Sequence, residues 1–226
     1  MFGVFVFDLV PFSIAQLDIW YDGRMELTQP VEWINKPVIG YAVNTEFSDD
    51  NARVLMELIN KISATFTDAV FCPPRSALHI TLLDWITPLV NYDGRDKNVL
   101  FAAVQPSYDK ALSDILASTR PITVTFDGIK VSPSTIYITG HDTGEFQKIR
   151  DQFVSSVELL PNTKLPPAII HSSLARFTKP IELSSANAFA ANQQLDITQK
   201  VTNFRLIRTT REPNLNFETL KRYELS

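Results

Sequence analysis

The chain is poor in residues on which several common kinds of protein site depend. Cys72 is the only cysteine among 226 residues, so an intrachain disulfide and a cysteine-based zinc site are excluded. A lone cysteine also leads us to expect a reducing, cytoplasmic location. Only seven glycines are present, without a Gly-x-x-x-x-Gly-Lys loop or a Gly-x-Ser-x-Gly elbow. The sequence therefore gives no support for ATP-dependent ligation or for a serine nucleophile on such an elbow.

Basic charge and long apolar runs are also scarce. The net charge of −4 is not that of a protein that coats long nucleic acid, although a local basic patch would suffice for a nucleotide or an RNA end. No stretch approaches the roughly 20 apolar residues of a membrane span, and no membrane partner is expected. The apolar start is interrupted by Asp8 and has no basic residue before Arg24, so we expect no cleaved signal peptide.

Histidine is scarce as well, and its placement carries the main functional signal. Two of the three histidines lie in apolar runs with a hydroxyl two residues later: His79 and Thr81 in LHITLL, and His171 and Ser173 in IHSSLA. Successive strand side chains alternate between faces, so each histidine would share a face with its hydroxyl. Each copy also follows a Pro-Pro pair and has a leucine directly after the hydroxyl.

The third histidine shows that this spacing alone is weak evidence. His141 is also followed by a threonine at the same spacing, but it lies between glycines and directly before a helix cap. We therefore expect His141 to be a surface or capping residue in a loop. Either motif histidine alone would more readily be a core residue hydrogen-bonded to its neighbours. The duplication, with one copy in each half of the chain, favours a shared functional cleft.

The apolar patterns predict mixed strands and helices, which is typical of an α+β fold. Strands are expected at 37–43, 78–83, 121–126, 134–139, 170–175, 201–209 and 217–225, with a further candidate at 3–10. Helices are expected around 54–62, after a cap at Ser107, across 146–157 and near 185–193. Residues 129–133 separate the third and fourth predicted strands, so the pattern does not imply a simple two-residue hairpin between them.

The duplicated motif resembles that of the 2H phosphoesterase superfamily, which includes the 2′-5′ RNA ligases and the cyclic nucleotide phosphodiesterases. Its signature is two His-x-Thr/Ser motifs, one per lobe. The element order from residue 37 onward and the closing YEL also look like theirs. The resemblance implies a bilobal, pseudo-symmetric α+β fold with two mainly antiparallel sheets around a central cleft and helices outside. We expect one such domain at 37–226, an extension at 1–36 and an insert at 84–106, the last two shaping the cleft rim.

The same resemblance implies a metal-independent phosphodiesterase. Its substrates would be RNA ends, 2′-5′ linked oligonucleotides or 2′,3′-cyclic nucleotides. His79 and His171 would act as base and acid, in an order that the sequence leaves open, while Thr81 and Ser173 would donate to phosphoryl oxygens. We expect a monomer without a cofactor. Any ligase activity would be the reverse of transesterification.

Substrate-binding residues are predicted around this pair of motifs. Arg176, five residues after His171, resembles a family position at the mouth of the site. Arg75, Arg205 and Arg208 are further candidates for phosphate contacts, and Tyr41 and Tyr137 for stacking on a base. A solvated surface charge, or ordinary core packing, is the alternative interpretation of each.

Two other functions remain open at this point. One is a catalytically weak module of the same fold that holds a nucleotide or an RNA end. The other is an unrelated hydrolase in which the motif is a coincidence, and a two-histidine metal site is a further alternative. Geometry separates these possibilities, because only a shared site requires His79 and His171 to face each other across one cleft.

Overall fold

The computed structural model of the protein describes residues 26–166 and 168–226, so the predicted strand at 3–10 and most of the predicted extension lie outside them. The strands are β1 (Pro37–Glu46), β2 (Val70–Phe71), β3 (His79–Ile86), β4 (Ile122–Ser132), β5 (Thr135–His141), β6 (Ile170–Phe177), β7 (Ile197–Val201), β8 (Asn203–Arg211) and β9 (Asn216–Glu224). The α-helices are α1 (Asp49–Thr65), α2 (Lys97–Leu116), α3 (Glu145–Ser156) and α4 (Leu183–Ala191).

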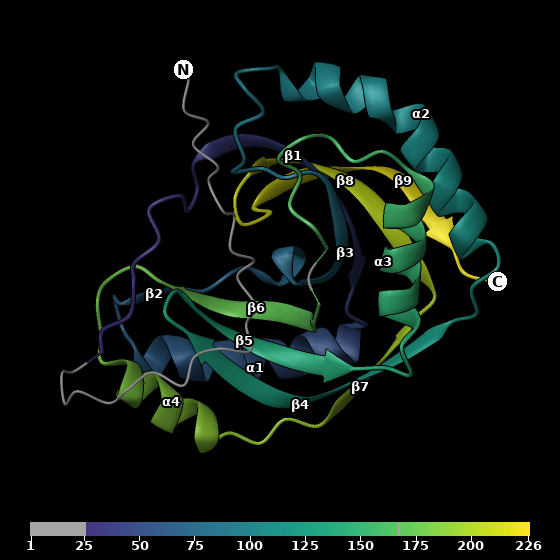
Figure 1. Cartoon of the computed structure of the whole chain (residues 1–226). Coiled ribbons are helices and arrows are strands. Elements are labelled where there is room, and N and C mark those ends of the chain that lie inside the picture. Colours follow the sequence, from purple (N-terminus) through teal and green to yellow (C-terminus); the bar gives the residue numbers. More distant parts are fainter. Residues whose placement is uncertain (1–25, 167) are drawn as a thin grey trace, which may run out of the picture.

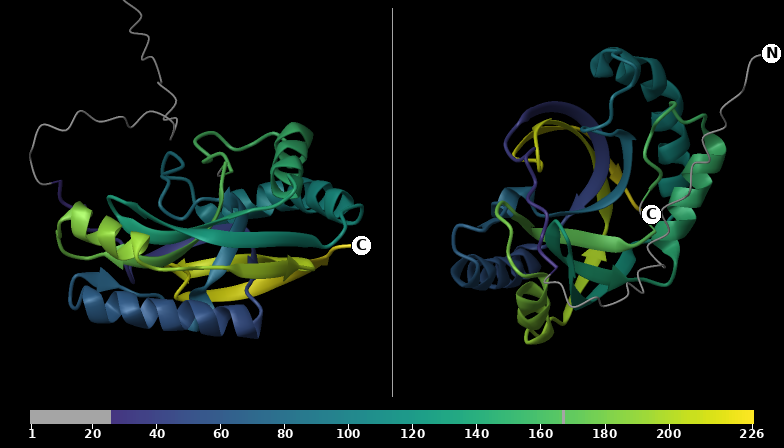
Figure 2. Two further views of the ribbon diagram at one scale, coloured as in Figure 1. Left: turned by 90° about the horizontal axis from the view of Figure 1, so that it is seen from below. Right: turned by 60° about the vertical axis from the view of Figure 1, so that its left-hand side comes forward.

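These strands form two antiparallel sheets. The first sheet has the order β3-β1-β8-β9 and the second has the order β2-β6-β5-β4-β7. The first sheet curls into a half-barrel, and β3 faces β6 where the two sheets meet (Figures 1 and 2). The prediction of an α+β fold with two antiparallel sheets is confirmed, and the two motif strands lie side by side at the junction.

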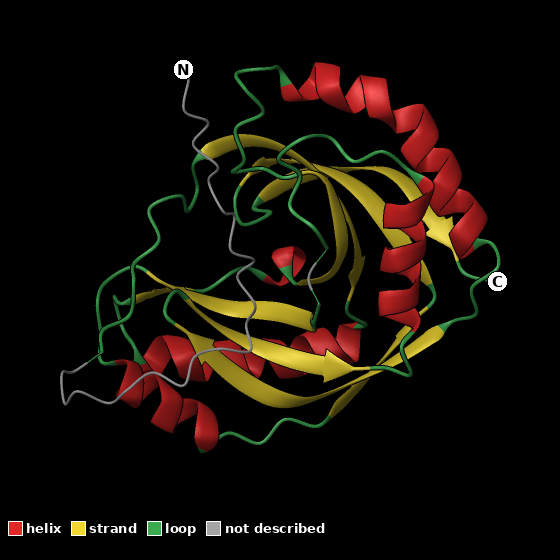
Figure 3. Ribbon diagram, in the orientation of Figure 1, coloured by secondary structure: helices red, strands yellow, loops and turns green. Residues whose placement is uncertain are grey.

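The helices cover the outer faces of the sheets (Figure 3). Two of them pack against the sheet that does not contain the motif strand following them in the sequence. The helix α1, which precedes β3, packs on β6 and β7 of the second sheet. The helix α3, which precedes β6, packs with α2 and contacts β3 of the first sheet. The helix before the first motif therefore packs on the sheet of the second motif, and the helix before the second motif contacts the strand of the first. In the described ranges, none of the helices has the length and apolar character that crossing a bilayer requires.

Aromatic packing fixes the far end of the first motif strand. The fully buried Trp85, on β3, lies 5.6 Å from Tyr108 and 6.1 Å from Phe101, both on α2, measured between ring centroids. Its ring also stacks on Phe153 of α3 at 6.4 Å. Large buried aromatic contacts of this kind hold neighbouring elements in one arrangement. They make β3 a rigid support for the side chains that precede Trp85.

The start of the second helix differs from the prediction. We expected it to begin after Ser107, but α2 runs from Lys97, with the Asp96 carboxylate accepting hydrogen bonds from the backbone of the first turn. Pro106 lies inside the helix. Proline lacks the backbone N–H that an interior turn uses and is a strong helix-breaking signal, which is why the sequence pattern misleads here. Much of the predicted insert is therefore the first half of α2.

The connection between β4 and β5 was also predicted wrongly. Ser132 pairs with Thr135, so the two strands are joined by a two-residue turn after all. The Asp127-Gly128 pair, a sequence typical of turns, lies within β4, where the register shifts between Phe126 and Gly128. A side chain at Gly128 would lie 2.8 Å from the Thr139 hydroxyl, so the close approach of β5 requires glycine there.

Candidate functional site

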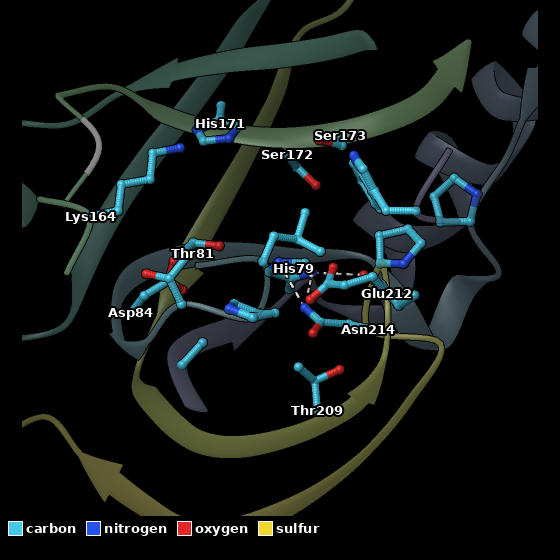
Figure 4. A pocket seen from close by; sticks show the side chains of 18 of the residues that line it. His79, Thr81, Asp84, Lys164, His171, Ser172, Ser173, Thr209, Glu212 and Asn214 are labelled. Carbon is cyan, nitrogen blue, oxygen red and sulfur yellow. Dashed lines mark hydrogen bonds between the residues drawn. The ribbon is translucent and has the colours of Figure 1, made fainter. Parts of the chain in front are cut away.

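A cleft of about 450 Å³ opens where β3 and β6 meet. His79 and Thr81 line it from β3, and His171 and Ser173 line it from β6 (Figure 4). The structure thus brings all four motif residues to one cleft. Other lining residues with polar or aromatic side chains are Trp33, Asp84, Thr87, Lys164, Ser172, Arg176, Thr209, Glu212 and Asn214.

The two motif strands share a local irregularity that the sequence did not reveal. The register of β3 with β1 skips Leu82, and the register of β6 with β5 skips Leu174. Both leucines directly follow the motif hydroxyl and are fully buried. A β-bulge inserts one residue and re-aims those after it. As a result Asp84 and Arg176, at equivalent places beyond the two bulges, also face the cleft.

His79 is held in one tautomer by two neighbours. Its Nδ1 lies 2.8 Å from the carbonyl oxygen of Ala77, which can only accept, so Nδ1 carries the hydrogen. Its Nε2 lies 3.2 Å from the side-chain amide nitrogen of Asn214, which donates to it. Burial lowers the pKa of His79 to about 4, and the positive charge of Arg205 adds to this. His79 is therefore neutral near pH 7, with its lone pair on Nε2.

His171 lies in a related but different environment. Burial lowers its pKa, and a hydrogen bond to the backbone of Ile169 opposes that effect. Nearby positive charges, of which Arg176 is the strongest, lower it further. The ring of Tyr137 meets the imidazole edge-on, with centroids 6.0 Å apart. Tyr137 therefore packs against the histidine from the neighbouring strand and is not among the residues that line the cleft.

Arg176 joins the second motif directly, at the place where the sequence predicted a residue at the mouth of the site. Its Nη2 donates to the Ser173 hydroxyl oxygen at 2.9 Å, which leaves the hydroxyl hydrogen free to be donated. Its guanidinium lies 5.2 Å from the ring centroid of Trp33. The buried Nε of Arg176 has no hydrogen-bond partner within residues 26–166 and 168–226. Arg176 thus offers an unused donor next to Ser173.

Two carboxyl groups on the opposite wall were not predicted as site residues. Burial raises the pKa of Asp84 to about 6. Burial also raises the pKa of Glu212 to about 7, and the nearby Asp84 carboxylate adds to this while Arg176 opposes it. Asp84 could have been found by aligning the two motifs, because it occupies the position of Arg176. Glu212 and Asn214 follow β8 and reach the cleft only through the tertiary fold.

Two predicted substrate-binding residues are not brought to the cleft. Tyr41 is buried, its ring stacks on Phe101 at 3.7 Å, and its hydroxyl donates to Asn98 at 2.8 Å. Arg75 forms an exposed ion pair with Asp49 at the start of α1. Alternation placed Tyr41 on a central strand correctly, but it does not distinguish a face covered by a helix from a face that opens to a cleft.

The remaining candidates also lie away from the cleft lining. Arg205 is buried and pairs with Glu46, and Arg208 lies 3.9 Å from Glu218. His141 was expected in a loop. It is instead the last residue of β5, with its side chain exposed. Within the described ranges, no group of three or more histidine, cysteine or carboxylate side chains is arranged to hold a metal ion.

The fold is similar to several solved structures at low sequence identity. TT0787 of Thermus thermophilus shares 15% identity at a TM-score of 0.59, covering 82% of this chain and 97% of that one. ATU0111 of Agrobacterium tumefaciens shares 14% identity at 0.59, covering 85% and 92%. LigT of E. coli, solved with NADP+, shares 16% identity at 0.52, covering 83% and 98%. These likenesses establish a LigT-like fold.

The sequence comparison covers the part of the chain that builds the cleft. No curated protein matches the chain. The profile of the 2′-5′ RNA ligase superfamily matches residues 52–213, a range that contains both motifs, Glu212, the whole second sheet and strands β3 and β8 of the first sheet. This range is well over half of the chain. The protein therefore belongs to the 2′-5′ RNA ligase superfamily, whose members are also called 2H phosphoesterases.

Proposed function

We propose that the protein is a metal-independent phosphodiesterase that acts on RNA ends, 2′-5′ linked oligonucleotides or 2′,3′-cyclic nucleotides. One observation carries this proposal: both His-x-hydroxyl motifs line the same cleft, from adjoining strands of two sheets. Two imidazoles and two hydroxyls around one space can supply the base, the acid and the hydrogen-bond donors for an in-line displacement at phosphorus. As the sequence led us to expect, we propose that the enzyme works as a cytoplasmic monomer.

The difference between the two histidines suggests their roles. His79 has its hydrogen on Nδ1 and its lone pair on Nε2, where a water or substrate hydroxyl would replace the Asn214 amide as the donor, so we assign it as the general base. His171 is assigned as the general acid. A bound phosphodiester anion favours its protonated form, because an opposite charge nearby raises the pKa of an imidazole. Superfamily membership alone leaves this order open.

Hydrolysis of a 2′,3′-cyclic phosphate then proceeds as follows. His79 removes a proton from a water molecule whose oxygen forms a new bond to phosphorus. The bond from phosphorus to one ribose oxygen breaks, and His171 gives its proton to that oxygen. The product is a nucleoside monophosphate. His79 is left protonated and His171 neutral, and exchange of one proton through solvent restores both.

Donors on the His171 side of the cleft are suited to the phosphoryl oxygens. The Ser173 hydroxyl hydrogen is free because its oxygen accepts from Arg176. The guanidinium of Arg176 lines the cleft beside Ser173 and would add a charged donor to a bound phosphate. Thr81 offers a further hydroxyl from the other wall. Preorganised donors of this kind stabilise charge that develops in the transition state.

The structural neighbours support a nucleotide-like ligand. Structures of E. coli LigT have been solved with NADP+ and with phosphate. The cleft of about 450 Å³ lies within the range typical of small-molecule sites. Trp33, from the segment before β1, lines the same cleft and offers an aromatic surface beside Arg176. A nucleoside attached to the phosphate would find both polar and aromatic contacts there.

The alternative is a module of the same fold that binds a nucleotide or an RNA end without turnover. The different environments of the two histidines favour an enzyme, since tight binding alone does not require a neutral base with a fixed tautomer. Mass spectrometry of long incubations separates the two. Ligand recovered unchanged from a tight complex would support the binding module.

The experiment compares three alanine variants on a panel of 2′,3′-cyclic nucleotides, 2′-5′ dinucleotides and RNA with cyclic phosphate ends. His79→Ala and His171→Ala should each lower kcat about 1,000-fold, the scale of general acid–base catalysis. His141→Ala is the matched control, because His141 has the same spacing to a threonine but lies outside the cleft lining. Its activity should be unchanged, and equal activities of all variants on every cleaved substrate would overturn the proposal.

A further inference from the structure

Arg150, on α3, is a buried cation with an unusual set of partners. Only 2% of its surface is exposed. Its Nε donates to the carbonyl oxygen of Leu82 at 2.8 Å, its Nη2 to that of Thr81 at 2.9 Å, and its Nη1 to that of Ile169 at 3.4 Å. In the described part of the chain, no carboxylate lies within ion-pair distance of it. All of its direct hydrogen bonds therefore go to backbone carbonyls.

Each of these carbonyls lies within one of the two motifs or directly before it. Thr81 is the first motif hydroxyl, and Leu82 is the bulge residue that follows it. Ile169 is the residue whose backbone hydrogen-bonds His171. Among the described strands, β3 is at the edge of its sheet, so strand pairing is available on only one of its sides. The guanidinium of Arg150 supplies donors that a neighbouring strand does not.

We propose that Arg150 is a positioning residue that sets the placement of the two histidine motifs relative to each other. It joins the bulge of β3 to the start of β6 through one rigid group, although the two strands belong to different sheets. Arg150 is not among the residues that line the cleft, so we assign it no part in proton transfer. The inference rests on the proposed function, because it concerns the alignment of the same base and acid.

The chemistry of the side chain explains why arginine is required. A guanidinium is planar and presents several N–H donors in a fixed fork, whereas an ammonium is a compact point charge on a flexible stem. Burial lowers the pKa of Arg150 to about 10, so it remains charged near pH 7. Its guanidinium also lies 5.4 Å from the ring centroid of Phe146, which helps to support the charge. Lysine would keep the charge but lose the fork.

A second cavity provides a way to test this. It has a volume of about 250 Å³ and is lined by Arg150 together with His141, Asp142, Phe146 and Gln147, among others. If Arg150 is truncated to alanine, the vacated space would open to this cavity. Free guanidinium ions could then reach the three carbonyls from solvent.

The kinetic experiment compares Arg150→Ala and Arg150→Lys with the parent on the best substrate of the panel. A misplacement of reacting groups by about 1 Å can cost about 100-fold, so we expect that loss of kcat in the alanine variant and about 10-fold in the lysine variant, with KM changed less than three-fold. Millimolar guanidinium should raise the kcat of the alanine variant at least ten-fold, while the same concentration of ammonium should not. Arg53→Lys is the control, an arginine on α1 that pairs with Asp50 on the surface, and should stay within three-fold of the parent.

An NMR measurement tests the inference independently of catalysis. The chain has only three histidines, so the imidazole ¹⁵N spectrum is simple. In both Arg150 variants the ring signals and pKa values of His79 and His171 should shift, and guanidinium should reverse the shift in Arg150→Ala. If no substrate is cleaved, the proposed function fails while these signals still decide the role of Arg150.

The inference is wrong if Arg150→Lys keeps the parent kcat and histidine spectrum, since charge alone would then suffice. It is also wrong if guanidinium restores neither signal nor rate in a folded alanine variant. If the alanine variant does not fold, as judged by circular dichroism, the lysine variant carries the same two readouts.

Discussion

The two motif strands have the same local construction but opposite surroundings. Both have a buried bulge leucine after the hydroxyl, and in both the residue two positions beyond that leucine faces the cleft. On β3 that residue is Asp84, and on β6 it is Arg176. Glu212 adds a second carboxyl to the first wall, and Lys164 adds a second cation to the cleft. A repeated backbone shape therefore carries an acidic wall and a basic wall.

This difference explains how one motif can supply both a base and an acid. His79 has a fixed tautomer and a pKa of about 4, whereas His171 lies among cations that attract a phosphate. Environment, and not residue type, separates the roles of two like groups. The predictions below test the separation, from the largest expected effect to the smallest.

The largest effect concerns the leaving group. If His171 is the acid, His171→Ala should lose about 1,000-fold in kcat on a ribose leaving oxygen but only about 10-fold on a p-nitrophenyl ester, whose phenolate leaves without a proton. His79→Ala should lose about 1,000-fold on both. Steady-state assays with the two substrate types measure this. The reverse pattern would exchange the two roles.

The two walls should have opposite effects on substrate affinity. Arg176→Gln should raise KM about 10-fold, because a charged hydrogen-bond donor to the phosphate is lost. Asp84→Asn should lower KM about three-fold at pH 8, where the carboxyl is ionised, and should have no effect at pH 5, below its pKa of about 6. Equal shifts in the same direction would show that the walls are not polarised.

Glu212 should make the folded protein less stable at high pH. Its pKa is raised to about 7 from an ordinary 4.5, so the folded state holds a proton that the unfolded chain releases. Its contribution to stability is present below pH 4.5 and is lost as the pH rises through 7. Glu212→Gln should therefore increase the free energy of unfolding by about 1–3 kcal/mol at pH 8 and by nothing at pH 4.5. Urea denaturation measures it, with exposed Glu57→Gln as the control.

The smallest effect is expected at Arg75. Its side chain pairs with Asp49 on the surface and does not line the cleft. Arg75→Ala should change kcat/KM by less than two-fold, in contrast to Arg176→Gln. Surface ion pairs contribute about 0–1 kcal/mol, so stability should hardly change. A large loss of activity would show that the substrate-binding surface extends beyond the cleft.

Sequence reasoning reached much of this arrangement because its strongest signals are local. Apolar alternation located β3 and β6, and the duplicated motif identified the four residues that the structure brings together. Pro106 inside α2 misled the helix boundary, because a proline is a local signal that tertiary packing can override. The two-residue turn before β5 was missed because the Asp-Gly sequence at the bulge in β4 is also typical of a turn.

The residues that sequence reasoning missed depend on contacts between distant segments. Asn214 and Glu212 reach His79 and the cleft from the connection after β8, and no short pattern marks them. Arg150 reads as one charged residue of an amphipathic helix, yet it is buried because α3 crosses to the other sheet. Tyr41 was wrongly predicted to bind substrate, because a position on a central strand does not tell which face of the strand opens to the cleft.

The most direct test of the account is a ¹⁵N imidazole titration of the parent protein with a nucleoside monophosphate. A single shared site predicts that the ring signals of His79 and His171 move together with one dissociation constant and that the pKa of His171 rises on binding. His141 should stay unchanged. Movement of only one motif histidine, or separate dissociation constants for the two, would contradict the claim that both motifs act on one phosphoryl group.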